Sequence, residues 1–227
     1  MAIAPFMENT ISSGGGNRTY DYYSPPGLAN PAPLCVVLHG GAQTIERILD
    51  RLQMAGSPAA GLVVPPYHVV APQGEGVVPL TGWNSGHSPG GQLLGTDDVT
   101  FIADVVDDYT VQVSGTASPV DPKRIYVIGF SNGGMMAYRL AAEKSELFAA
   151  VCVISGNIGG RPTLIGTPHV NDPLILNPPH PVSVYHVHGL LDDVVSPFGG
   201  PSPNTASTRV DRGAFNSINT WVRHNNC

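Results

Sequence analysis

The chain has 227 residues, of which 42% are hydrophobic and 12% charged, and 17 acidic side chains against 11 basic ones give a net charge of -6. This length and composition exclude a disordered chain and predict a single domain over residues 1–227. The sequence has no basic run, which argues against a nucleic-acid partner, and no apolar run of about 18 residues, which argues against a membrane span.

Strand-like and helix-like segments alternate along the chain. Apolar, β-branched or alternating runs predict strands at 18–23, 33–39, 68–71, 125–128, 148–155 and 182–188. Helical apolar spacing and helix-forming composition predict helices at 45–55, 99–109, 135–144 and 211–225. A tight turn is expected at 120–124. This order predicts an α/β fold in which helices cover both faces of a mostly parallel central sheet.

The acidic residues around helix 99–109 have a simple structural interpretation. Thr96 and the two residues after it can cap the start of that helix. The others fit a solvated helix face, so cap and surface together account for the group Asp97, Asp98, Asp104, Asp107 and Asp108.

The termini and the cysteines bear on the setting of the chain. Residues 1–10 lack the basic and long apolar regions of a signal peptide, so the protein is either intracellular or has lost its signal. Cys35 and Cys152 lie in apolar runs and are expected to be small buried side chains. Cys227 ends a polar tail, which suits a partner beyond the end of this chain.

The stretch with the strongest chemical content is Gly129-Phe-Ser131-Asn-Gly133. A β-branched run precedes this Gly-x-Ser-x-Gly motif and a helix-forming run follows it. Glycines permit a sharp strand-to-helix turn that exposes the serine hydroxyl near the helix N-terminus. We therefore predict that Ser131 is a nucleophile, with a purely structural glycine turn as the alternative.

Two other loops are expected to complete the site. Strand 33–39 leads into His39-Gly40-Gly41, whose backbone N–H groups would form an oxyanion hole with that of Asn132; an ordinary glycine turn is the alternative. Residues 73–95 form a long loop in which Trp83-Asn84 is expected to line the substrate pocket with His39. Trp83 could equally serve only to pin the loop. Residues 156–181 are Pro-rich and predict a short lid.

A serine nucleophile requires a histidine base and an acid that orients it. Asp192 follows strand 182–188 and is preferred as the acid over its neighbour Asp193. The base is harder to place, because only His224 follows Asp192, and it falls within a predicted helix. His87 in the glycine-rich loop is the other candidate, and the remaining histidines lie in strands, at their ends or in the Pro-rich loop.

The sequence indicates no metal or nucleotide cofactor. The histidines lack ligand spacing with nearby cysteines or glutamates, apart from His186-x-His188, and a lone pair is a weak zinc signal. No phosphate-binding loop is found.

Several separated motifs together resemble the polyhydroxybutyrate depolymerase and feruloyl esterase family of α/β-hydrolases. These motifs are Val37–Gly41, Gly82-Trp83-Asn84, Asp97-Asp98-Val99-x-Phe101-Ile102, Val120–Tyr126, Gly129–Met135 and His188-Gly189-x-x-Asp192-x-x-Val195. The resemblance implies secretion, small or polymeric ester substrates, Ser131 as nucleophile and Asp192 as acid. It also implies that the oxyanion donors come from Asn132 and the His39–Gly41 turn.

The chain departs from that pattern at its C-terminal end. Family members continue past this point with a strand, a loop carrying the catalytic histidine and a cysteine that pairs with the equivalent of Cys227. The resemblance therefore implies a serine carboxylic-ester hydrolase whose C-terminal segment is not part of these residues. The alternative is a ligand-binding protein of the same fold with impaired catalysis.

Overall fold

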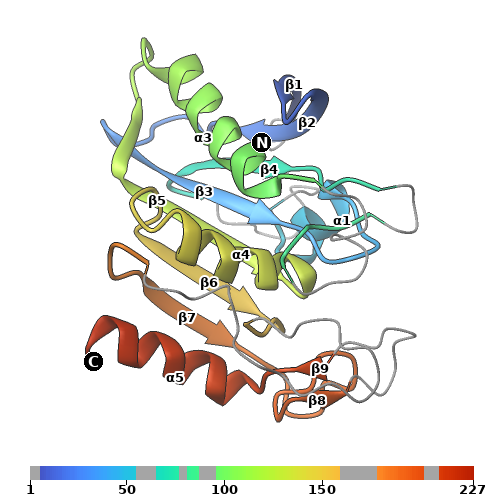
Figure 1. The fold of residues 1–227 in the computed structure, drawn as a ribbon. Coiled ribbons are helices and arrows are strands. Elements are labelled where there is room, and N and C mark those ends of the chain that lie inside the picture. The colour runs from blue at the N-terminus through green and yellow to red at the C-terminus, as the bar shows by residue number, and fades with distance from the viewer. Residues whose placement is uncertain (1–5, 55–64, 77–80, 87–95, 159–177, 202–209) are drawn as a thin grey trace.

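Five parallel strands form the centre of the computed structural model, and two antiparallel strands extend one edge (Figure 1). The structure describes residues 6–54, 65–76, 81–86, 96–158, 178–201 and 210–227. The sheet has the order β1-β2-β4-β3-β5-β6-β7. Its strands are β1 (Met7–Ser13), β2 (Gly16–Tyr23), β3 (Ala32–Leu38), β4 (His68–Pro72), β5 (Val120–Phe130), β6 (Ala150–Ile154) and β7 (Ser183–Val187). The predicted mostly parallel sheet is confirmed.

The antiparallel edge is a hairpin of which the sequence predicted only the second strand. β1 and β2 are joined through Gly14 and Gly15, whose φ angles of 61° and 86° lie in the left-handed region. Two such residues form the tight turn that suits the twist of a hairpin. β1 was not predicted because its second half is polar apart from Ile11, which gives no clear strand pattern.

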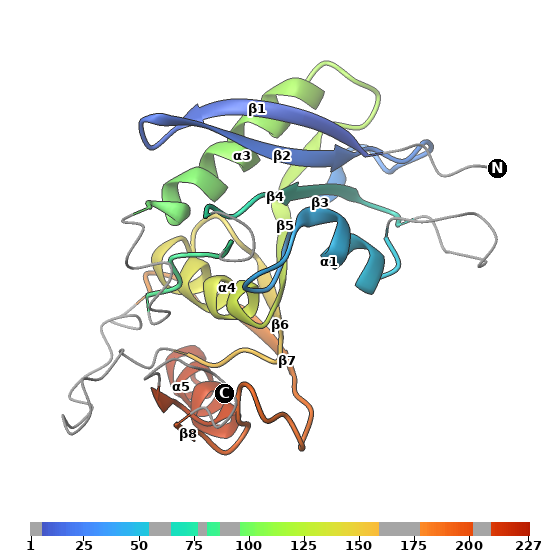
Figure 2. The same ribbon diagram turned by 90° about the vertical axis from the view of Figure 1, so that its right-hand side faces the viewer.

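The helices form two unequal layers. Figure 2 shows α3 (Asp98–Val113), α4 (Asn132–Glu143) and α5 (Ala214–Asn225) on one face of the sheet and α1 (Ile45–Arg51) on the other. A large core fills the three-helix face, and a smaller core lies between α1 and the strands β3 and β4. Among the described residues, no helix is long and apolar enough to cross a membrane.

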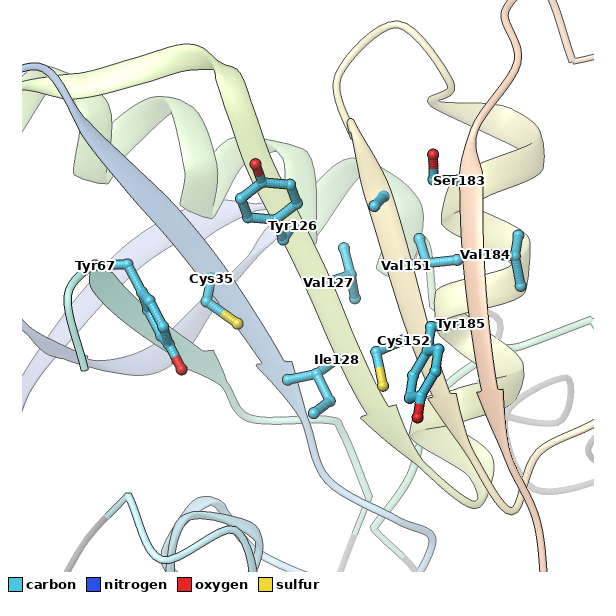
Figure 3. A pocket seen from close by; sticks show the side chains of 11 residues that line it. Cys35, Tyr67, Tyr126, Val127, Ile128, Val151, Cys152, Ser183, Val184 and Tyr185 are labelled. Atoms are coloured by element: carbon cyan, nitrogen blue, oxygen red, sulfur yellow. The ribbon is translucent and has the colours of Figure 1, made fainter. Parts of the chain in front are cut away.

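On the α1 side, a groove of about 360 Å³ opens over β5, β6 and β7 (Figure 3). Its lining includes Cys35, Tyr67, Tyr126, Cys152 and Tyr185, and the Tyr185 side chain is 69% exposed. Helices therefore lie on both faces, but within the described residues α1 covers only part of its face. Full burial of Cys35 and Cys152 was expected, and this is corrected: both are partly exposed.

β5 begins earlier than the sequence predicted, because a turn is built into the strand. Asp121 accepts a hydrogen bond from the backbone N–H of Lys123 (2.9 Å), and the pairing register with β3 shifts between Ala32 and Leu34. The predicted tight turn at 120–124 is therefore an irregular first part of β5. Two further short strands, β8 (Gly200–Pro201) and β9 (Val210–Asp211), pair between β7 and α5.

The acidic residues of α3 are less exposed than the sequence suggested. Asp97 caps the helix by accepting from the N–H of Thr100 (3.1 Å), as expected. Asp104 and Asp108 instead face the hairpin, where they accept hydrogen bonds from the hydroxyls of Ser13 (2.7 Å) and Tyr20 (2.6 Å), respectively. Asp98 is fully buried. The assignment to a solvated face is therefore wrong for Asp104 and Asp108, because the hairpin packs against the helix, and the cap role suggested for Asp98 is replaced by burial.

Candidate active site

Ser131 lies in the sharp turn between β5 and α4. Its backbone has φ 54° and ψ -119°, a strained conformation for a residue with a side chain. Its N–H donates to the carbonyl oxygen of Ile154 (2.8 Å), which ties the turn to the end of β6. Ser131 directly follows β5, so it lies at the carboxyl edge of the parallel strands, where it is partly exposed.

The glycines of this turn are required by close backbone approach. A Cβ atom on Gly129 would overlap the carbonyl oxygen of Gly133, and one on Gly133 would overlap the carbonyl oxygen of His39. The second contact brings the end of β3 directly against the start of α4. The motif is thus a packing requirement of this turn and of its junction with β3.

The Gly40–Gly41 turn lies beside Asn132. A Cβ atom on Gly41 would be 3.6 Å from that of Asn132. Asn132 is the first residue of α4, so its backbone N–H has no partner within the helix. The structure thus brings Ser131, Asn132 and the Gly40–Gly41 turn together at the carboxyl edge of β3 and β5.

His39 supports this arrangement from behind. It is fully buried, its Nδ1 contacts the Gly40 carbonyl oxygen (2.8 Å), and its Nε2 accepts from the N–H of Gly74 (2.9 Å). These partners require a neutral ring protonated on Nδ1, and burial lowers the pKa of His39 accordingly. Because both nitrogens are engaged, His39 orders the turn and is not a free base.

Trp83 lies against His39 on the inner side of the same turn. Its indole N–H donates to the His39 carbonyl oxygen (2.8 Å), and the ring centroids are 4.9 Å apart. Trp83 is also fully buried. Both of these predicted pocket residues are thus fully buried where they pack against each other. The alternative that Trp83 pins the loop agrees with the structure.

The side chain of Asn132 joins the sharp turn between β5 and α4, called the elbow below, to the loop of Trp83. Its Oδ1 accepts from the backbone N–H of Trp83 (2.7 Å), and its Nδ2 donates to the Trp83 carbonyl (3.2 Å) and to the hydroxyl of Ser85 (3.0 Å). The side chain therefore fixes the loop while the backbone N–H remains at the helix N-terminus. The motif predicted the N–H role alone, since the loop contact is visible only in the tertiary structure.

Asn84 is held by three backbone and side-chain contacts. Its N–H donates to Asp98 (2.6 Å), its carbonyl accepts from Arg139 (2.5 Å), and its side chain donates to the carbonyl of Thr96 (2.8 Å). Asp98 in turn pairs with Arg18 at 2.7 Å. Asn84 is only partly buried, so of the three predicted pocket residues it is the one whose exposure suits that role.

The buried pair of Arg18 and Asp98 escaped sequence reasoning. Both side chains are almost completely buried, and the guanidinium also lies 3.6 Å from the ring centre of Phe101. The pair links β2, the start of α3 and the loop that holds Trp83. The motif Asp97-Asp98-Val99 was the only sign of this pair in the sequence, and a helix cap explained that motif equally well.

Asp192 lies in the loop that follows β7, also at the carboxyl edge of the sheet. Its Oδ1 accepts from the N–H groups of Val194 (3.0 Å) and Val195 (2.9 Å), and its Oδ2 lies 3.6 Å from Nε2 of His188. Its side chain is 18% exposed, whereas Asp193 is exposed. Asp192 is therefore the carboxylate that the loop holds in a defined orientation.

His224, one of the two candidate bases, lies at the wrong end of the sheet. In Figure 1, β7 points to the right and α5 returns to the left, which places its C-terminal end near the start of β7. The contacts agree, because His224 approaches the carbonyl of His180 (3.3 Å) and Asn225 bonds Val182. The length of β7, about 13 Å, thus separates His224 from the carboxyl edge. His87 lies outside the described residues.

The described residues contain no group of three or more His, Cys, Asp or Glu side chains that could hold a metal ion. His186 and His188 instead bond to each other, with Nε2 of the first 3.0 Å from Nδ1 of the second.

The chain is similar in sequence to known esterases and depolymerases. The phospholipase/carboxylesterase family matches residues 99–209. NocK of Nocardia uniformis subsp. tsuyamanensis, named provisionally as an esterase, is 33% identical over 92% of this chain and 54% of its own length. The poly(3-hydroxyalkanoate) depolymerase C of Paucimonas lemoignei is 30% identical over 65% of this chain and 33% of its own. Feruloyl esterase B of Piromyces equi is 27% identical over 58% and 22%.

Solved structures show the same fold. A thermostable esterase superimposes with a TM-score of 0.61 at 21% identity, covering 99% of this chain and 53% of its own. The chain spans about half or less of the length of the curated relatives described above. The predicted α/β-hydrolase fold and the resemblance to depolymerases and feruloyl esterases are confirmed.

Proposed function

Because this chain is an α/β-hydrolase related in sequence to carboxylic-ester hydrolases, we propose that it carries the nucleophile and acid of a serine esterase. The observation that supports this most directly is Ser131 in its strained turn, beside the first N–H of α4 and the Gly40–Gly41 turn. A hydroxyl held next to unused N–H groups suits attack on a carbonyl carbon.

The proposed reaction has two stages. Ser131 Oγ attacks the ester carbonyl, and the negative oxygen that forms is stabilised by the N–H groups of Asn132 and the Gly40–Gly41 turn. The intermediate expels the alcohol and leaves an acyl-enzyme on Ser131. Water then attacks that acyl group through a second such intermediate, releasing the acid and restoring the serine.

The proton of Ser131 requires a base. Four of the described histidines have both ring nitrogens engaged, namely His39, His68, His186 and His188. The other two, His180 and His224, lie at the opposite end of β7. We therefore assign the base to a histidine outside the described residues, oriented by Asp192. The Asp192 loop suits this role, because two N–H groups hold one carboxylate oxygen and direct the other to one side.

For the substrate, we propose an ester with an aromatic or short aliphatic acyl group, of the feruloyl or polyhydroxyalkanoate type. The names of the relatives support this class. The loop of Asp192 also carries exposed apolar side chains, with Leu190 74% and Leu191 96% exposed. Comparing hydrolysis of feruloyl, short acyl and hydroxybutyrate esters would identify the acyl group.

A fluorophosphonate probe tests the nucleophile. With free imidazole added as a base, labelling of the wild-type chain and its loss in Ser131→Ala are expected, since the probe reacts only with an activated hydroxyl. Free imidazole should also accelerate ester hydrolysis by the wild type beyond the rate with Ser131→Ala, because it replaces the base in solution. Ligand binding without labelling, even with imidazole, would instead establish the second candidate, a binding protein of this fold with impaired catalysis.

A further inference from the structure

A continuous row of hydrogen bonds runs from the buried helix layer to the loop of Asp192. The Tyr138 hydroxyl on α4 lies 2.7 Å from Nδ1 of His186 on β7. Nε2 of His186 lies 3.0 Å from Nδ1 of His188, and Nε2 of His188 lies 2.7 Å from the carbonyl oxygen of Val195. The row thus ends on the residue whose N–H is bound by Asp192.

When both rings are neutral, the last acceptor fixes the direction of every bond in the row. A carbonyl oxygen only accepts, so Nε2 of His188 carries a hydrogen and donates to Val195. In a neutral ring, Nδ1 of His188 must then accept, so His186 donates from Nε2. Nδ1 of His186 consequently accepts from the Tyr138 hydroxyl. One arrangement of protons satisfies all four groups.

Burial favours the neutral form of His186 in this row. Desolvation, with the neighbouring His188 as a second cause, lowers the pKa of His186 to about 4. The two imidazole rings stack at 5.2 Å between centroids with 13° between planes, so a charge on one opposes a charge on the other. Trp221 of α5 stacks on Tyr138 and covers the far end, and Tyr138 itself is 2% exposed.

The row ends on the loop that orients the proposed catalytic acid. Nε2 of His188 faces both the Val195 carbonyl and, at 3.6 Å, the second oxygen of Asp192. Val195 is almost fully buried and anchors the loop, while its N–H binds the first oxygen of the same carboxylate. If the His188 ring were rotated, or protonated on Nδ1 in place of Nε2, it would lose its hydrogen bond to the Val195 carbonyl. It would also no longer present a hydrogen to Asp192.

We propose that His188 is a positioning residue for Asp192, held in its Nε2–H form between the Val195 carbonyl and the relay of Tyr138 and His186. This inference rests on the proposed role of Asp192 in ester hydrolysis. His188 acts through the loop: it fixes Val195 and presents a hydrogen, rather than a lone pair, to the carboxylate. The relay thereby couples a buried tyrosine on the elbow helix to the acid loop two strands away.

Nitrogen-15 NMR of the histidine rings tests the relay directly. At neutral pH, His186 and His188 of the wild type are both expected to carry a hydrogen on Nε2. Tyr138→Phe removes the donor to Nδ1 of His186, so the His186 signals should shift, whereas the Val195 carbonyl still holds the hydrogen of His188 on Nε2. An Nδ1-protonated His188 in the wild type, or His186 signals unchanged in Tyr138→Phe, would overturn the proposal.

The chain offers a matched control for that substitution. The Tyr109 hydroxyl lies 3.0 Å from Nδ1 of His68, whose Nε2 lies 2.8 Å from the carbonyl of Ser118, but this pair is remote from Asp192. Tyr109→Phe should alter the His68 signals and leave those of His186 unchanged. An equal effect of both variants on His186 would indicate a general loss of packing and contradict the relay.

Kinetics separates positioning from simple stability. In the chain supplied with imidazole, His188→Ala should lower kcat about 10- to 100-fold with KM unchanged, as expected for a misplaced catalytic group. His188→Gln keeps an N–H donor for Val195 and should recover most of the rate, and failure to recover it would count against the proposal. If the wild type shows no hydrolysis or labelling, the proposed function fails, while the NMR experiment still decides the relay.

Discussion

The side chain of Asn132 holds the backbone of Trp83 from both sides, accepting from its N–H at 2.7 Å and donating to its carbonyl at 3.2 Å. This contact joins the first residue of the elbow helix to the loop that packs beneath the Gly40–Gly41 turn. Asn132 therefore has two roles. Its backbone N–H lies at the proposed oxyanion hole, and its side-chain amide positions the loop of Trp83.

Asn132→Ala is expected to lower kcat about 10- to 100-fold, since the backbone N–H remains but the loop loses its anchor. It should also cost about 1–3 kcal/mol of unfolding free energy, because the buried N–H of Trp83 loses its acceptor. Asn225 makes the same paired contact with Val182 at the opposite end of the sheet. Asn225→Ala should lower stability and leave kcat unchanged; an equal fall in both variants would contradict a specific role.

Gly133→Ala should destabilise the fold by about 3 kcal/mol or more, because its Cβ would overlap the carbonyl oxygen of His39. Chemical denaturation measures this loss, and soluble yield provides a second readout. Gly115→Ala is the control, since nothing lies within 4 Å of its added Cβ. A Gly133→Ala protein as stable as the control would show that β3 and α4 do not approach as closely as described.

Arg18→Met should lower the unfolding free energy by about 3–5 kcal/mol, since it leaves the Asp98 carboxylate buried without its cation. The double variant Arg18→Met/Asp98→Leu is expected to recover part of that loss, because no charge then remains buried. Arg124→Met removes the partner of Asp121 in a more exposed pair and should lower the unfolding free energy far less. Equal losses in Arg18→Met and Arg124→Met would argue against a buried ion pair.

The lowered pKa of His186 predicts a loss of stability in mild acid. Its pKa is about 4 in the folded chain, against about 6.5 when unfolded. Between these values the unfolded chain binds the extra proton, so stability falls as pH decreases from about 6.5 to about 4 and the loss levels off below. The expected decrease from this partly buried group is about 2 kcal/mol. Denaturation across this range should show a shallower slope for His186→Gln, and an unchanged slope would contradict the assignment.

Local sequence order determined the main architecture. The apolar runs predicted four of the six expected strands within three residues at each end, because buried parallel strands show as continuous hydrophobic segments. Polar–aromatic alternation predicted the antiparallel β2 equally closely. The sixth, β5, was predicted only for its regular part. The elbow was also predictable, because a turn so sharp requires glycine on both sides of Ser131.

Contacts between distant segments decided the rest. The sequence suggests a helix cap for Asp98, but in the structure the side chain of Arg18 on β2 pairs with it. The sequence suggests a pocket wall for Trp83, but in the structure its indole packs against His39. His224 follows Asp192 in the chain, yet α5 carries it back to the amino end of β7. The row from Tyr138 to Asp192 joins a helix, a strand and a loop. The sequence by itself thus determined the strands, the elbow and the order of the site residues, because local pattern and backbone sterics specify these. Only the tertiary structure decided which polar groups are buried together, because their partners lie far away along the chain.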